Sequence, residues 1–148
     1  MKISAKGRYG LAAMTHIAQN YQAGDPITII SIAEKLGISK IYLEQVFSLL
    51  KRAGLVLSIK GAQGGYQLAA TPKKITAFAI LSAIELALFE PTESTVKEKA
   101  AAIDEAMQTI VFNAIDKTLE TTLKTVTLID LVNEVEKHKE KDNLMYFI

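Results

Sequence analysis

Hydrogen-bonding side chains gather on one side of a short helix that the sequence predicts after Ser39. The apolar residues of this stretch recur at i, i+3, i+4 and i+7, which makes them a buried face: Leu43, Val46, Phe47 and Leu50. The opposite side then carries Lys40, Glu44 and Gln45. Glutamine can bond N6 and N7 of adenine, and glutamate can accept from N4 of cytosine, so this side suits the major groove of duplex DNA.

The preceding residues predict the helix-turn-helix that such a face requires. A first helix is expected over residues 31–36, and Gly37 ends it because glycine adopts the left-handed conformation without steric penalty. Ser39 is expected to cap the second helix by accepting a hydrogen bond from a backbone N–H. Gly54 ends the second helix, and a β-prone run begins at Leu55.

A glycine-cornered hairpin follows the two helices. Residues 55–60 and 66–70 are predicted strands, and residues 27–28 are expected to add a short third strand. Lys60 begins the connecting loop, where a wing reaches the DNA backbone or the minor groove. The loop is no nucleotide-binding loop, because Gly-x-x-x-x-Gly-Lys-Ser/Thr is absent. The alternative is a helix-turn-helix that packs against or binds protein, and the cationic wing argues against it.

The N-terminal residues predict a helix with a cationic beginning. Apolar residues recur at helical spacing from about Gly7 to Tyr21. Lys2, Lys6 and Arg8 precede or open this helix, and both basic side chains and helix N-termini attract phosphate. We therefore expect a phosphate clamp at this end.

Charge divides the chain into two parts. Residues 1–74 carry ten basic and three acidic side chains, a net +7, whereas residues 75–148 carry a net −6. This division favours a winged helix-turn-helix DNA-binding domain over 1–74 and a helical dimerisation or regulatory region over 75–148. No signal-peptide core or membrane-length apolar run is evident, so a cytoplasmic protein is expected.

The absence of particular residue types narrows the chemistry. The chain has no cysteine, which removes disulfides, thiolate metal sites and cysteine-ligated iron–sulfur clusters. Its two histidines have no neighbouring catalytic or metal-ligand pattern. We therefore expect no enzyme activity, no cofactor and no metal.

The second half predicts helices at about 75–88, 94–124 and 127–139. The long middle helix carries apolar residues in steps of four and three, which is typical of a coiled-coil seam: Val96, Ala100, Ile103, Met107, Ile110 and Ala114. This seam predicts a homodimer, and the alternative is a helix buried within its own domain. The chain ends in an apolar tail that includes Tyr146, Phe147 and Ile148. We expect this tail to pack against the protein, to pair as a strand or to bind a partner.

Four motifs in this order resemble the Rrf-two (Rrf2) family of bacterial winged-helix transcription regulators. They are Lys-Ile-Ser-x-Lys-Gly-Arg-Tyr-Gly at 2–10, Tyr-Leu-Glu-Gln at 42–45, Ala-Gly-Leu-Val at 53–56 and Lys-Gly-x-x-Gly-Gly-Tyr-x-Leu at 60–68. The resemblance covers roughly residues 1–90 well and the remainder more loosely. It implies that Glu44 and Gln45 face bases in the major groove. It also implies a minor-groove arginine at the first wing residue, where this chain has Lys60, which lacks the flat guanidinium fork.

The resulting expectation is a mainly α fold: a winged helix-turn-helix with a two- or three-stranded β wing plus a long C-terminal dimerisation helix. We expect it to be a homodimeric repressor that binds a pseudo-palindromic operator. The expected DNA-binding residues are Lys2, Ser4, Lys6, Arg8, Tyr9, Ser39, Lys40, Ile41, Tyr42, Glu44, Gln45, Lys60, Gly61, Gly64, Gly65 and Tyr66.

Within that family the chain resembles the repressors of cysteine metabolism. Cluster-binding members carry three cysteines after the break at Pro91, where this chain has Thr92 to Lys99 without a soft ligand. The ending Met-Tyr-Phe-Ile also resembles the tail by which serine acetyltransferase occupies the active site of cysteine synthase. The resemblance therefore implies cysteine synthase as a partner of the tail, while the competing interpretation is a tail that folds back on its own dimer.

Overall fold

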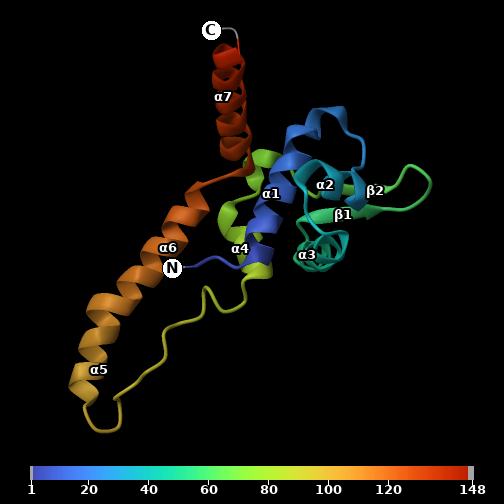
Figure 1. Ribbon diagram of the computed structural model, residues 1–148. Helices are drawn as coiled ribbons and strands as arrows, with labels where there is room; N and C mark the ends of the chain where they lie inside the picture. Colours follow the sequence, from blue (N-terminus) through green and yellow to red (C-terminus); the bar gives the residue numbers. More distant parts are fainter. Residues whose placement is uncertain (1, 147–148) are drawn as a thin grey trace.

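A computed structural model describes residues 2–146 and contains a winged helix-turn-helix from which a long helix extends (Figure 1). Helix α1 precedes the helix-turn-helix pair α2 and α3, and the hairpin of β1 and β2 follows. Their bounds are α1 Ala5–Gln19, α2 Ile29–Leu36, α3 Lys40–Arg52, β1 Val56–Ile59 and β2 Gly65–Leu68. Within residues 2–146, no helix has both the length and the apolar character needed to cross a membrane.

The ends of the helix-turn-helix pair follow from local hydrogen bonding. The Thr28 hydroxyl caps α2 by accepting the Ser31 N–H at 3.1 Å. Gly37 ends α2 with φ +66°, which confirms the predicted turn glycine. Ser39 does occupy the cap position of α3, but its side chain accepts no hydrogen bond from the helix. The predicted capping bond of Ser39 is therefore wrong, because the position of a cap residue does not fix the rotamer of its hydroxyl.

One hydrophobic core joins the winged helix to the second half of the chain. The predicted apolar face of α3 is confirmed, since Leu43, Val46, Phe47 and Leu50 are fully buried. Met14 of α1 and Ile32 of α2 pack into the same cluster. Four residues beyond the wing also belong to it: Ile75 just before α4 (Ala77–Ile84), Ile80 and Ile84 within α4, and Leu128, the first residue of α7 (Leu128–Tyr146). The core thus ties α4 and the start of α7 to the DNA-binding elements.

The wing is a two-stranded antiparallel sheet in which Val56 pairs with Leu68 and Ile59 with Gly65. The predicted third strand is reduced to a single bridge between Ile27 and Tyr66, with N···O distances of 2.9 and 2.8 Å. Gly65 allows this bridge, because a Cβ there would collide with the Ile27 backbone.

The long helix of the second half begins later than the sequence predicts. It runs from α5 (Ala101–Met107) through a π-helical segment (Gln108–Phe112) into α6 (Asn113–Thr125). The predicted start near Ser94 is wrong, so Val96 and Ala100 precede the helix and do not form part of its face. The reason is Asp104, whose Oδ1 accepts the N–H groups of Thr95 and Val96 at 2.9 and 3.1 Å. These bonds fold residues 95–96 back onto α5 and compete with helix formation.

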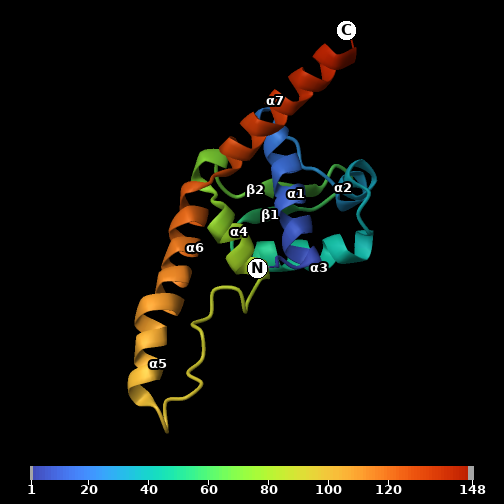
Figure 2. The ribbon, with the colours of Figure 1, turned by 60° about the vertical axis from the view of Figure 1, so that its left-hand side comes forward.

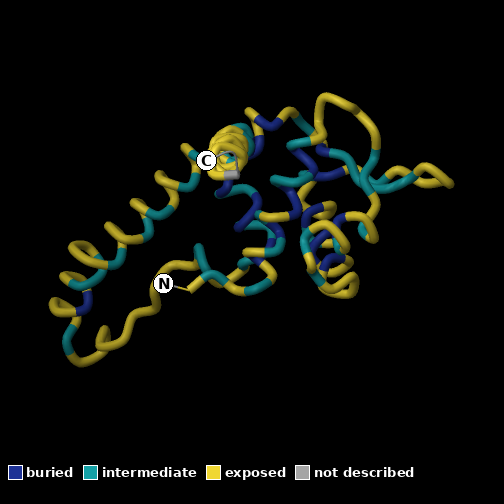
Figure 3. The backbone as a smooth tube through the Cα atoms, turned by 45° about the horizontal axis from the view of Figure 1, so that its top comes forward, coloured by how far each residue is buried: buried dark blue, intermediate teal, exposed yellow. Residues whose placement is uncertain are grey.

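Helices α5 and α6 extend away from the winged helix (Figures 1 and 2). Their apolar side chains are exposed in the single chain, at 60% for Ile103, 73% for Ile110 and 53% for Ile115. In Figure 3 most residues of these helices are coloured as exposed, with intermediate positions between them. The π-helical segment widens one turn and shifts the face by about one residue, so the straight seam expected from the sequence is interrupted between Met107 and Ala114.

Helix α7 is longer than predicted, because it continues to Tyr146 where the sequence predicts an end near Lys139. Its first turn is fixed by reciprocal hydrogen bonds between Thr127 and Asp130. Its later turns project beyond the body of the molecule (Figure 2). Leu144 and Met145 are 65% and 70% exposed there. Phe147 and Ile148 lie outside the described residues.

Candidate nucleic-acid interface

The first turns of α3 present the side chains that the sequence assigns to base contact. Glu44 and Gln45 are exposed, and Ile41 and Tyr42 are 68% and 47% exposed beside them. Lys40 lies one turn before Glu44, with 3.8 Å between Nζ and Oε1. An exposed pair of this spacing contributes only about 0.3–0.5 kcal/mol, so both side chains stay available to a ligand.

The start of α1 lies next to the start of α3. The ring centroids of Tyr9 and Tyr42 are 5.9 Å apart, which joins the two helix beginnings. Ser4 caps α1 by accepting the Gly7 N–H at 3.2 Å. Three exposed cationic side chains surround this end of α1: Lys2, Lys6 and Arg8.

The wing approaches α3 from the other side. Lys40 of α3 and Lys60 of the wing line one shallow groove of about 470 Å³, together with the loop glycines Gly61, Gly64 and Gly65. The Tyr66 ring contacts Phe47 with centroids 4.6 Å apart, so its place in the sheet fixes the wing against α3. The structure thus brings the N-terminal cations, the α3 residues and the wing cation to adjoining positions.

Sequence reasoning missed six residues of this groove. They come from the start of α2 and from the wing: Thr28, Ile29, Ile30, Ser58, Ile59 and Ala62. Ile30 is 55% exposed although it belongs to an apolar run, and the helix predicted over 31–36 does not include it. The signal that identifies Thr28 is a capping threonine directly before that run.

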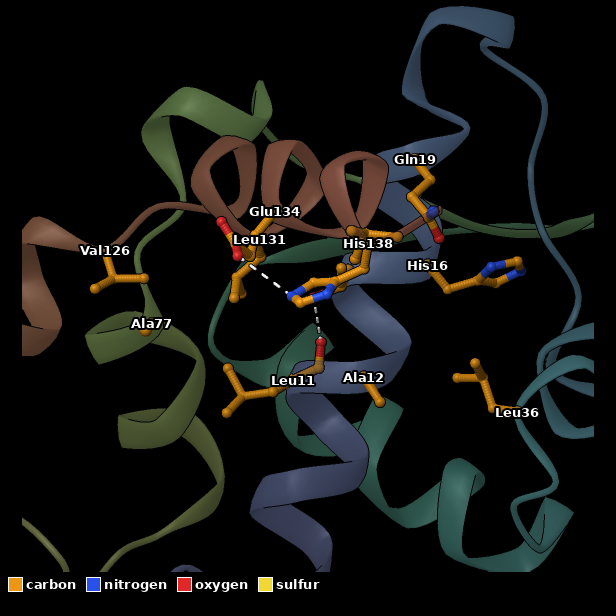
Figure 4. Close-up of a pocket in the computed structure, with 12 residues that line it drawn as sticks. Leu11, Ala12, His16, Gln19, Leu36, Ala77, Val126, Leu131, Glu134 and His138 are labelled. Carbon is orange, nitrogen blue, oxygen red and sulfur yellow. Dashed lines mark hydrogen bonds and ion pairs between the residues drawn. The ribbon is translucent and has the colours of Figure 1, made fainter. Parts of the chain in front are cut away.

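A separate apolar groove of about 630 Å³ lies between α1 and α7 (Figure 4). Leu11, Ala12 and Leu131 line its floor, and His138 pairs with Glu134 on its rim at 3.3 Å. The figure shows His16 at the opposite side, turned away from His138. Burial lowers the pKa of His16 below its ordinary value, and the nearby Lys35 acts in the same direction.

In a comparison with known proteins, residues 3–134 match the model of the Rrf2 family, which is described as an iron-dependent transcriptional regulator. The transcriptional regulator IscR of Aliivibrio salmonicida is 33% identical over 146 residues, covering 97% of this chain and 86% of that protein. The structure of CymR, the global cysteine regulator of B. subtilis, superposes with a TM-score of 0.75 at 37% identity, covering 90% of this chain and 98% of that one. IscR of T. potens superposes with a TM-score of 0.71 at 35% identity, covering 93% and 90%.

The donor atoms of this chain do not fit an iron–sulfur cluster. The sequence contains no cysteine, and thiolate is the ligand that such clusters require. The polar side chains of residues 92–99 end in hydroxyl, carboxylate or ammonium groups. Among residues 2–146, no three histidine, aspartate or glutamate side chains are gathered as a metal site would need. The family description mentions iron, but the described residues of this chain offer no site for an iron–sulfur cluster.

Proposed function

Because this chain belongs to the Rrf2 family of DNA-binding transcriptional regulators, which are not enzymes, we propose that it is a homodimeric repressor of a pseudo-palindromic operator. The single observation that carries the proposal is the exposed start of α3, where Glu44 and Gln45 lie between two cationic segments. Cations fix a protein on the phosphate backbone, and hydrogen-bonding side chains discriminate bases. The proposed phosphate contacts come from the start of α1 and from Lys60.

The proposed dimer forms through the exposed face of α5 and α6. Ile103, Ile110, Val111 and Ile115 are between 45% and 73% exposed on this single helical rod. An isolated rod with so many exposed aliphatic side chains is typical of a helix that packs against a second copy. A two-fold pair would present two copies of α3, which favours an operator with inverted half-sites.

We place the proposed regulon in cysteine and sulfur metabolism. The similarity to a protein described as a global cysteine regulator supports this assignment, as does the lack of cluster ligands in this chain. The proposed partner of the end of α7 is cysteine synthase, and the proposed location is the cytoplasm. Leu144 and Met145, which directly precede the proposed partner residues Tyr146, Phe147 and Ile148, are exposed. Deletion of Phe147 and Ile148 should abolish enzyme binding in calorimetry and leave the dimer intact, and unchanged affinity would reject this partner site.

An alternative function from another class is a protein-interaction module that uses the winged-helix shape without specific DNA binding. The exposed Ile41 and Ile30 favour it, because both are aliphatic side chains on the face assigned to DNA. Specific DNA binding separates the two functions, since base readout depends on sequence whereas apolar docking does not.

The test is fluorescence anisotropy of the full-length protein on the upstream region of its own operon, against a scrambled duplex of equal composition. The proposal predicts binding at least a thousandfold tighter to the upstream region at physiological salt, as is usual for specific regulators. Equal affinity for both duplexes would reject the proposed repressor and favour the alternative.

A further inference from the structure

The carboxylate of Glu85 lies at the start of α1, where the DNA-binding function described so far gives it no role. Its Oε1 accepts the Ser4 backbone N–H at 2.7 Å and the Ser4 hydroxyl at 2.5 Å. Glu85 occupies the C-terminal cap of α4, and its own N–H donates to Leu81 O at 2.6 Å. The side chain therefore connects the end of α4 to a residue that lies 81 positions earlier in the sequence.

This contact fixes how Ser4 caps α1. The Ser4 hydroxyl donates its proton to Glu85, which leaves an oxygen lone pair to accept the Gly7 N–H at 3.2 Å. Gly7 leaves the space that this arrangement needs, because a Cβ there would collide with the Glu85 carboxylate and with Ile3. Two hydrogen bonds to one ionised carboxylate are stronger than bonds between neutral groups.

The fixed cap in turn orders the cationic end of the helix. Arg8 donates from Nη1 to the Ile3 carbonyl at 2.5 Å, so its side chain folds over the segment that Ser4 anchors. Lys2 lies on that segment, and Lys6 lies in the first turn of α1. The orientation of these three cations depends on the backbone at residues 2–5, which Glu85 ties to α4.

We propose that Glu85 is a positioning residue for DNA binding, which holds the N-terminal cations in the geometry that contacts phosphate. The proposal rests on the phosphate clamp described under the proposed function. Charge repulsion alone and a positioning role predict opposite effects of removing Glu85. By repulsion alone, an acidic side chain close to the DNA face weakens binding, so its removal should strengthen binding. If Glu85 positions the cations, its removal should weaken binding.

Four variants of the full chain separate these effects: Glu85→Ala, Glu85→Gln, Ser4→Ala and Arg8→Ala. Glu90→Ala is the matched control, since Glu90 is an exposed acid five residues along with no side-chain hydrogen bond in the described structure. Affinity for the operator is measured by fluorescence anisotropy between about 50 and 200 mM salt, where phosphate contacts determine the slope of affinity against salt. Thermal melting of each variant reports on folding.

Glu85→Ala should lose on the order of tenfold in affinity, the cost of about one charged hydrogen bond, and should flatten the salt slope by about one phosphate contact. Glu85→Gln should restore most of the affinity, because its amide oxygen still accepts from Ser4. Ser4→Ala, a smaller change, should reproduce the loss even if Glu85→Ala melts early. Glu90→Ala removes the same charge and should bind at least as tightly as the natural protein.

Three results would overturn the proposal. The first is a Glu85→Ala protein that matches Glu90→Ala in affinity and in salt slope while Arg8→Ala is impaired, which would leave Glu85 as a structural tie alone. The second is an Arg8→Ala protein with unchanged affinity and slope, which would remove the phosphate clamp itself and with it any positioning role. The third comes from the double variant Glu85→Ala with Arg8→Ala. If its loss equals the sum of the two single losses, the positioning role is contradicted, because residues acting as a unit are not additive.

Discussion

At the scale of single residues, the proposed DNA face combines an acidic side chain with basic ones, and we expect the acidic side chain to discriminate between bases. Glu44 is exposed at the start of α3 and Lys40 pairs with it at 3.8 Å. A carboxylate repels phosphate but can accept from N4 of cytosine. Its expected contribution is therefore to sequence preference, while overall affinity comes from Lys and Arg side chains.

Glu44→Ala should relax base preference by about 1–3 kcal/mol at one base pair of each half-site, because one base contact is lost. Affinity for random DNA should stay equal or rise, since a negative charge is removed. Competition binding with operators mutated one base pair at a time measures both quantities. Equal loss of specific and random binding would contradict base readout by Glu44.

Lys60 tests the wing. Lys60→Ala should weaken binding to every duplex and reduce the salt slope by about one, since one phosphate or minor-groove contact is lost. Lys60→Arg keeps the charge and adds a flat guanidinium, so it should bind more tightly where the minor groove is narrow. Anisotropy on operators with and without central A-tracts gives the comparison, and a Lys60→Ala protein with an unchanged salt slope would exclude wing contact.

At the scale of secondary-structure elements, periodicity predicts which residues form helices better than it predicts where the helices end. The buried side of α3 could be predicted because four apolar residues fall on one helical face. The start of the long helix could not, because Val96 and Ala100 fit the helical spacing while Asp104 draws the backbone of residues 95–96 into a turn. The capping bond of Ser39 could not be predicted either, because it depends on the rotamer of the hydroxyl, which the sequence pattern does not fix.

Asp104→Ala should release residues 94–100 and speed amide exchange at Thr95 and Val96, the two N–H groups that its carboxylate accepts. Those bonds hold the pKa of Asp104 below its ordinary value, with the Val96 N–H the largest cause. The associated stability is therefore present above the unfolded pKa and is lost as pH falls through the lower folded pKa. Hydrogen exchange by mass spectrometry checks this, and unchanged protection of the two amides in the variant would contradict it.

Ile110 tests the long helix as a dimer surface. Ile110→Glu places a charge on an apolar face and should give monomers, because burying an unpaired charge costs several kcal/mol. Ile110→Val is the matched control and should remain a dimer. Light scattering at micromolar concentration measures the mass, and a native protein that is already monomeric would defeat the proposed assembly.

At the scale of the whole molecule, the division of charge agrees with the roles that we propose for the two halves, DNA binding for the basic half and dimerisation for the acidic half. The basic half contains the helix-turn-helix and the wing, and the acidic half contains the projecting helices. Sequence could predict this division and the order of motifs. It could not predict that α4 and Leu128 complete the core of the basic half, because that packing joins segments far apart in the chain.

The most direct test of the central claim is selection of bound duplexes from a random DNA pool by the full-length protein. A two-fold dimer should enrich two inverted half-sites with centres about 34–36 Å apart, one turn of DNA, or a multiple of that spacing. The Glu44→Ala protein should enrich the same spacing with a relaxed base at one position in each half. A pool without an enriched motif, or with a single unpaired half-site, would contradict the account.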